Sequence, residues 1–181
     1  MGDQRYHEFM DLYRPLHGAF VRFCSSHGYG IIDTEDLVQE TILHVLQRFG
    51  SIREKEKLLG YMIATASNLV KNQLRRRKFQ GQFDERAFRK LECRTGNPEL
   101  SMEIHLLYEA MHKLPHRDKE ALILFEVNGF SMQEIAVIQD AGLSATKTRI
   151  SRARQKLREL LGDAETTRKI VPKTAQLFTL L

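Results

Sequence analysis

SMQEIAVIQDAGLSATKTRISRARQKLRELL, residues 131–161, contains two helical patterns separated by a short turn. Ser131, followed three residues later by Glu134, is a capping-box signature that predicts the start of a short helix. A second helix, rich in lysine and arginine, follows directly after the turn. Two helices joined in this way, the second with a cationic face, are typical of a helix-turn-helix that places its second helix in the major groove.

The second helix of this stretch has one apolar side and one basic side. At about 100° per residue, the apolar stripe contains Leu143, Ile150, Ala153, Leu157 and Leu161. The opposite face carries Ser144, Lys147, Thr148, Ser151 and Arg152, and it is flanked by Arg149 and Arg154. Cations mixed with short hydroxyl side chains suit phosphate oxygens and base edges, which predicts DNA binding by these seven residues. The alternative is a solvated helix face, the usual fate of a charge run.

Composition bounds the possible classes of protein. A length of 181 residues with 42% hydrophobic content suits one domain or two small ones. The net charge of +5 is compatible with a polyanionic partner, although it also fits many ordinary proteins. Cys24 and Cys93 lie far apart without metal-ligand spacing, so we expect reduced packing residues, no metal site and no cofactor.

No membrane or secretory segment is expected. No apolar run approaches the ~20 residues of a membrane span, and the first residues lack the core of a signal peptide. We therefore expect a cytoplasmic protein without membrane insertion.

Apolar residues at three- and four-residue steps along most of the chain predict an all-α protein. One helix is expected from Tyr6 to about Ser26, a second after the capping residue Asp33, and a third from about Lys57 to Lys78. The second is predicted to bury Leu37, Val38, Leu43, Leu46 and Phe49, and the third Leu59, Met62, Ile63, Ala66, Val70 and Leu74. These helices are expected to form one bundle over residues 5–79.

A second helical domain is predicted over residues 97–161. Residues 80–96 are mostly polar or charged and end in a turn signal, so we interpret them as a linker. Asn97 and Pro98 are suited to open a helix, and another apolar helix runs from Pro115 to Val127 before the helix-turn-helix. The apolar half of the tail, residues 162–181, is expected to dock, either completing the core of the second domain or covering a binding surface.

Residues 114–160, LPHRDKEALILFEVNGFSMQEIAVIQDAGLSATKTRISRARQKLREL, resemble the fourth conserved region of bacterial sigma factors. Residues 33–49, DTEDLVQETILHVLQRF, look like their second region, and residues 61–78, YMIATASNLVKNQLRRRK, look like the stretch that follows it. With its short linker, the chain is most similar to the small extracytoplasmic-function group. The resemblance implies a non-enzymatic subunit that binds core RNA polymerase and directs it to promoter DNA, with an anti-sigma factor as a further candidate partner.

The resemblance also implies a polymerase-binding site in the second region. There the family docks on the largest polymerase subunit, so Asp36, Leu37, Gln39 and Glu40 are the positions carried over. Acidic residues near a helix start are also favoured by the helix dipole, which is the structural alternative.

The third helix has its own polar face. Opposite the apolar stripe lie Tyr61, Asn68, Asn72 and Arg75, with Lys71 and Arg76 nearby. An aromatic ring, amides and arginines suit unstacked bases and their phosphates. The resemblance implies that this face and the loop at residues 50–58 read a promoter element and capture a flipped base. The structural alternative is that the cations only stabilise the C-terminal end of the helix through its dipole.

Two positions depart from the family pattern. Tyr61 stands where tryptophan is common, and it keeps a stacking face of smaller area. Asp140 occupies the usual turn-glycine position, so the basic helix is expected to begin at Ser144. A different reading is a stand-alone helix-turn-helix regulator whose first domain dimerises; a catalytic bundle is disfavoured, because no glycine-rich phosphate loop or nucleophile constellation is present.

Overall fold

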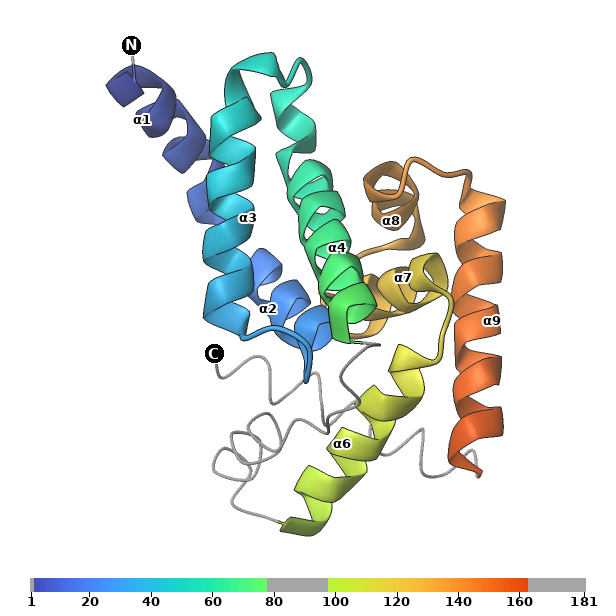
Figure 1. Ribbon diagram of the computed structural model, residues 1–181. Coiled ribbons are helices and arrows are strands. Elements are labelled where there is room, and N and C mark those ends of the chain that lie inside the picture. The colour runs from blue at the N-terminus through green and yellow to red at the C-terminus, as the bar shows by residue number, and fades with distance from the viewer. Residues whose placement is uncertain (1, 78–97, 163–181) are drawn as a thin grey trace. The chain divides into compact units, whose positions relative to one another are not determined.

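The computed structural model describes residues 2–77 and 98–162, and within these ranges it contains helices and no β-strand (Figure 1). The chain forms two compact units, one up to Gln80 and one from Gly81 onward. The predicted all-α class with two helical domains is confirmed. The predicted linker at residues 80–96 lies outside the described residues, as does the tail beyond Gly162.

The first unit is built on an antiparallel pair of helices, α3 and α4, which lie side by side (Figure 1). Its elements are α1 (Gly2–Tyr13), a 3-10 turn at Arg14–Leu16, α2 (His17–Gly28), α3 (Thr34–Arg48), 3-10 turns at Phe49–Ser51 and Lys55–Lys57, and α4 (Leu58–Arg77). Aromatic rings fill the core together with aliphatic side chains of α3 and α4, and fully buried examples are Phe9, Phe20, Phe23, Phe49, Leu37 and Met62.

The single helix predicted from Tyr6 to about Ser26 is wrong, because the chain forms two helices there. Pro15 lies in the 3-10 turn between α1 and α2. Proline has no backbone N–H, and its ring clashes with the carbonyl of the preceding turn, so the α-helical ladder stops. Across the break, the Tyr13 hydroxyl and His17 Nδ1 form a hydrogen bond of 2.7 Å.

Helix α3 begins where the sequence predicts, but one of its predicted core residues faces outward. The Asp33 carboxylate caps the helix by accepting a hydrogen bond from the Glu35 N–H at 3.0 Å. Leu43 was predicted to be buried and is 59% exposed, whereas Thr41 and Val45 are fully buried. Leu43 lies six residues after the buried Leu37, about 240° around the helix, so it cannot share the inward face.

Helix α4 buries four of the six residues predicted for its apolar stripe, and the other two, Leu59 and Leu74, are half-buried. Met62, Ile63, Ala66 and Val70 are buried as expected. Leu58 takes the inward position at the start of the helix, while Leu59 is half-buried.

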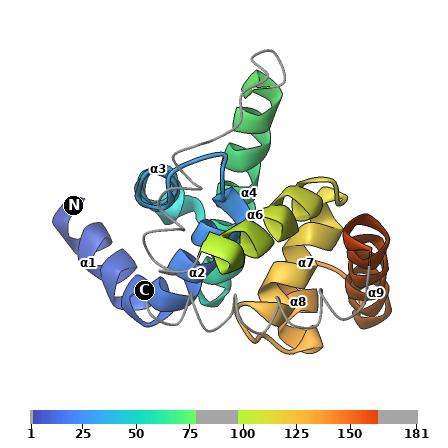
Figure 2. The same ribbon diagram turned by 90° about the horizontal axis from the view of Figure 1, so that it is seen from below.

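The second unit packs three shorter helices against one long one. It contains α6 (Pro98–His112), α7 (His116–Glu126), α8 (Met132–Ile138) and α9 (Leu143–Leu161). Helix α9 contacts the other three, and Figure 2 shows it almost end-on beside α7 and α8. The core between them contains Ile104, Leu107, Ile123, Leu124, Ile135, Ile150 and Leu157.

The predicted helix-turn-helix is formed by α8, the turn at residues 139–142, and α9. The capping box is present: the Ser131 N–H donates to Glu134 Oε2 at 2.8 Å, and the Glu134 N–H donates to Ser131 Oγ at 3.3 Å. Helix α9 begins at Leu143, one residue before the predicted start. Asp140 has a φ of +47°, the left-handed region that glycine favours.

Candidate DNA and polymerase interfaces

The basic face predicted on α9 is exposed. Ser144, Lys147, Thr148, Ser151, Arg152 and Arg154 are exposed, and Arg149 is half-buried. Ile150, Ala153 and Leu157 form the buried side as predicted, together with Thr146, whose hydroxyl donates to the Gly142 carbonyl at 3.2 Å. Leu143 was predicted to belong to this stripe but is 38% exposed. As the first residue of the helix, it has no preceding turn to shield it.

The cations of this face differ in their partners. Arg152 Nε lies 3.4 Å from Asp118 Oδ2, and Arg154 Nε donates to Glu126 Oε1 at 2.8 Å. Lys147 makes no ion pair with any residue in the described ranges. The face therefore combines an unpaired cation with arginines that α7 holds in place.

The hydroxyl groups of the face also differ. The Thr148 hydroxyl donates to the Ser144 carbonyl one turn earlier at 2.9 Å, a bond that leaves its oxygen lone pairs open. Thr148 is therefore best suited to accept a hydrogen bond from a ligand, whereas a serine hydroxyl without such a bond both donates and accepts.

A groove runs between α3 and α4 in the first unit. Its volume is about 200 Å³, and it is lined by His44, Arg48, Tyr61, Thr65, Asn68, Leu69 and Asn72. Three of the side chains predicted to bind unstacked bases, Tyr61, Asn68 and Asn72, thus line one surface. Lys71, Arg75 and Arg76 are exposed on the same helix but do not line the groove.

Sequence reasoning missed the residues that α3 contributes to this groove. His44 and Arg48 lie four residues apart, so they share one face of α3. Their spacing was readable in the sequence, but its meaning depended on α4 lying beside that face.

The outer face of α3 carries the predicted polymerase-binding residues, with one correction. Asp36, Gln39 and Glu40 are exposed, whereas Leu37 is completely buried. A Cβ added at Gly28 would lie 3.0 Å from Leu37 Cδ2, which shows how closely Leu37 packs on the end of α2. Leu37 therefore holds α3 in position and has no surface to offer a partner.

Cys24 is fully buried and unpaired, and burial raises the pKa of its thiol. These properties agree with the packing role predicted for it; Cys93 lies outside the described residues.

Among residues 2–77 and 98–162, no three His, Cys, Asp or Glu side chains are grouped so as to hold a metal ion. In the same ranges, every helix is too short or too polar to span a bilayer.

Two family models match the two units in the order expected of a sigma factor. The model of sigma-70 region 2 matches residues 9–80, and that of sigma-70 region 4 matches residues 104–157. The class defined by the fold and by these matches is a sigma-70-type transcription initiation factor.

Individual relatives narrow the class. The ECF RNA polymerase sigma factor EcfG of Rhodopseudomonas palustris is 31% identical over 127 residues, which cover 70% of each chain. The RNA polymerase sigma factor CarQ of Myxococcus xanthus is 29% identical over 133 residues, which cover 72% of this chain and 76% of CarQ. The chain belongs to the ECF group of RNA polymerase sigma factors.

A solved structure shares the fold. The sigma factor RpoE from Bartonella quintana, crystallised with the anti-sigma factor NepR, superposes with a TM-score of 0.57 at 24% identity. The match covers 86% of this chain and 99% of that chain. Sigma factors are non-catalytic initiation factors, and this one directs core RNA polymerase to promoters. The alternative of a stand-alone regulator is not favoured.

Proposed function

We propose that this sigma factor divides promoter recognition and polymerase binding among three surfaces. The basic face of α9 reads duplex DNA at the upstream promoter element. The groove between α3 and α4 holds an unstacked base, and the outer face of α3 docks on core polymerase. The chain acts in this scheme by binding and catalyses no reaction. Because its partners are core polymerase and promoter DNA, we also propose a cytoplasmic location.

The exposure of the α9 face is the observation that carries the first part. Six of its seven predicted residues are exposed on one long helix that follows the turn of a helix-turn-helix. The Arg154–Glu126 pair joins side chains that are 46% and 23% exposed, so it is worth about 1 kcal/mol at most, and a DNA phosphate competes readily with it. Arg152 is 63% exposed but pairs with Asp118, whose side chain is only 6% exposed, so Arg152 keeps this pair and binds DNA through its remaining donors.

The groove supports the second part of the proposal. Tyr61 supplies an aromatic face, Asn68 and Asn72 supply donors and acceptors for a base edge, and Arg48 supplies positive charge. Opening a duplex costs a few kcal/mol per flipped base, so a melted promoter persists when the extruded base is held. Lys71, Arg75 and Arg76 then serve as contacts to the adjoining phosphates.

The α3 face supports the third part and gains one residue over the sequence prediction. Leu43 is exposed and lies one turn beyond Gln39 and Glu40, so the four side chains Asp36, Gln39, Glu40 and Leu43 form a continuous strip. An apolar contact bordered by acidic and amide groups is a suitable docking site for a basic partner surface. Leu37 is removed from the contact set and replaced by Leu43.

An anti-sigma factor is the remaining partner that we propose. The related sigma factor of Bartonella quintana was crystallised with NepR, and Met102 and Leu106 form an exposed apolar pair on α6, at 48% and 52%. A helical partner would cover such a pair with its own apolar stripe. Purified NepR from Bartonella quintana is a direct probe, and Leu106→Arg should weaken its binding if α6 is the contact.

The DNA-reading proposal is tested with Lys147→Ala. After promoters are identified by run-off transcription with core polymerase on genomic fragments, this change should cost about 1 to 3 kcal/mol on the preferred sequence if Lys147 reads a base. Lys113→Ala is the matched control, because Lys113 is an exposed lysine that follows α6 and does not belong to the α9 face. Equal losses on preferred and random DNA would show that Lys147 binds phosphate without reading sequence.

The docking proposal is tested with Asp36→Arg. The change reverses one charge on the exposed strip, and we expect core polymerase affinity to fall at least about tenfold, which corresponds to about 1.4 kcal/mol. Asp11→Arg on α1 makes the same charge change on an exposed residue away from the strip. Core affinity that falls equally in both variants would mean that net charge, and not this surface, controls binding.

A further inference from the structure

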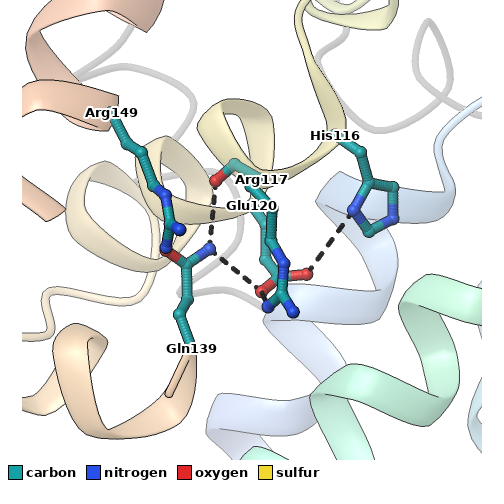
Figure 3. Close-up of polar contacts among 5 residues, drawn as sticks. All are labelled: His116, Arg117, Glu120, Gln139 and Arg149. Atoms are coloured by element: carbon teal, nitrogen blue, oxygen red, sulfur yellow. Dashed lines mark hydrogen bonds and ion pairs between the residues drawn. The ribbon is translucent and has the colours of Figure 1, made fainter. Parts of the chain in front are cut away.

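Gln139 connects all three helices of the DNA-binding region through one side chain. It follows α8, directly before the turn residue Asp140, and it is 2% exposed. Its Nε2 donates to the Arg117 carbonyl and to Glu120 Oε1, both on α7, at 3.0 Å each. Its Oε1 accepts a hydrogen bond of 2.8 Å from Arg149 Nη1 on α9 (Figure 3).

These three bonds define how the amide of Gln139 is oriented. Both N–H groups of the amide are directed at acceptors of α7, so the oxygen must point toward the arginine. A flipped amide would aim its oxygen at a carbonyl and a carboxylate, and its N–H groups at a guanidinium. Because a buried polar group left without a partner is unfavourable, the network holds one arrangement.

The partner of Arg149 also differs in charge from those of the neighbouring arginines. Arg152 and Arg154 are paired with the carboxylates of Asp118 and Glu126. Arg149 is bound by a neutral amide, which fixes the guanidinium without cancelling its charge.

The negative charge nearest to the amide is itself balanced. Glu120 Oε1 lies 3.6 Å from Arg117 Nη1, and Glu120 Oε2 lies 4.0 Å from His116 Nδ1 (Figure 3). The positive charge of Arg149 therefore remains available to an anion.

We propose that Gln139 is a positioning residue that holds the Arg149 guanidinium at the edge of the α9 basic face, ready to bind a DNA phosphate. The inference rests on the proposed DNA contact by α9. A long arginine side chain normally loses rotamer freedom when it binds, and this loss reduces affinity. Anchoring to Gln139 removes that freedom before DNA arrives, and the four remaining donors of the guanidinium stay open for phosphate.

The proposal is tested by a double-mutant cycle in the full-length chain. The probe is a short fluorescein-labelled DNA duplex of mixed sequence, titrated at several NaCl concentrations. Gln139→Met keeps the length and apolar stem of the side chain but removes its three hydrogen bonds. We expect it to weaken binding about threefold to tenfold, with little change in salt dependence, because Arg149 keeps its charge.

Arg149→Met should weaken binding about tenfold and reduce the slope of log K against log salt by about 0.9, the value for one lost phosphate contact. The double variant should bind no more weakly than Arg149→Met alone, because Gln139 acts through that arginine. Equal effects of Gln139→Met with and without Arg149, or no effect when Arg149 is present, would overturn the positioning role.

Two controls separate the possible failures. Lys147→Ala reports on the α9 face independently of Gln139: if neither it nor Arg149→Met weakens binding, the proposed DNA face is wrong. If both weaken binding and Gln139→Met does not, only the positioning role is wrong. Circular dichroism checks that each variant folds. If Gln139→Met does not fold, Gln139→Asn replaces it in the same cycle. Its amide is one methylene shorter, too short to keep the hydrogen bonds to α7 and the bond to Arg149 together.

Discussion

One backbone angle sets the turn between the two helices of the DNA-binding motif. Asp140 adopts a positive φ, and it is the only non-glycine residue with one in the described ranges. Aspartate tolerates this region better than most residues, but a Cβ there still meets the following carbonyl. The sequence places an aspartate where the turn geometry favours glycine, and the chain keeps the geometry.

We predict that Asp140→Gly stabilises the protein by about 0.5 to 1 kcal/mol. Relief of left-handed strain contributes about 1 to 2 kcal/mol, and the greater freedom of glycine in the unfolded chain offsets part of it. Urea unfolding measures the difference. Asp140→Val should destabilise the protein, since a β-branched residue is least compatible with this φ. If Asp140→Gly is less stable than the wild-type protein, the turn is not strained.

Leu37 and Leu43 lie on the same helix and have opposite roles. Leu37→Ala removes a fully buried side chain and should lower the free energy of unfolding by about 2 to 5 kcal/mol. Leu43→Ala, at a position 59% exposed, should change stability by no more than about 0.5 kcal/mol. Leu43→Ala should fold and should bind core polymerase more weakly than the wild-type protein does. If the two variants have comparable free energies of unfolding, the assignment of Leu37 as buried and Leu43 as exposed is contradicted.

At the scale of single elements, the short helix α8 depends on its cap. Hydrogen bonds from Ser131 hold the pKa of the Glu134 carboxyl below its usual value. A carboxyl whose folded pKa is lowered stabilises the native state above its unfolded pKa, about 4.5, and loses that contribution as the pH falls through the folded pKa.

We therefore predict that Glu134→Gln flattens the acid side of the stability profile. Glutamine still accepts the hydrogen bond from the Ser131 N–H but does not titrate, so the difference in melting temperature between the two proteins should narrow as the pH drops below about 4.5. Thermal melts from pH 3 to pH 7 measure it. A gap that stays constant across this range would mean that the ionised carboxylate adds nothing to the cap.

The groove of α3 and α4 yields a prediction about promoter opening. Tyr61→Ala removes the aromatic face and should weaken the hold on an unstacked base by about 1 to 3 kcal/mol, whereas Tyr61→Trp enlarges the face and should favour opening. Permanganate reactivity of thymines in the polymerase–promoter complex measures the open fraction. Duplex binding through α9 serves as the control and should not change, and equal opening by both variants would exclude Tyr61 from base capture.

At the scale of the whole molecule, our proposal places polymerase docking on the first unit and duplex reading on the second. Asp36→Arg should abolish transcription while retaining duplex binding, and Lys147→Ala with Arg152→Ala should lose promoter selectivity while retaining core binding. A mixture of the two proteins should not restore transcription, because each initiation complex needs both surfaces on one chain. Restoration by mixing would favour subunits that act together, as in the stand-alone dimeric regulator.

Much of this organisation was readable along the chain. Apolar periodicity predicted the helices, and Asp33, Ser131 and Glu134 marked helix starts, because capping involves residues only two or three apart. The exposed residues of α9 were likewise predicted, since one helix turns its cations and its aliphatic residues to opposite sides. Pro15 marked a local break as well, and the prediction of an unbroken helix overlooked it.

Long-range packing determined the rest. The sequence could not show that Leu37 faces inward and Leu43 outward, because both are leucines and the choice depends on where α2 and α4 lie. It also gave no sign that Gln139 holds Arg149, since ten residues and a turn separate them. Periodicity along a helix defines its faces, but the identity of what each face meets comes from elements far away in the chain, and their contacts exist only once the helices have packed.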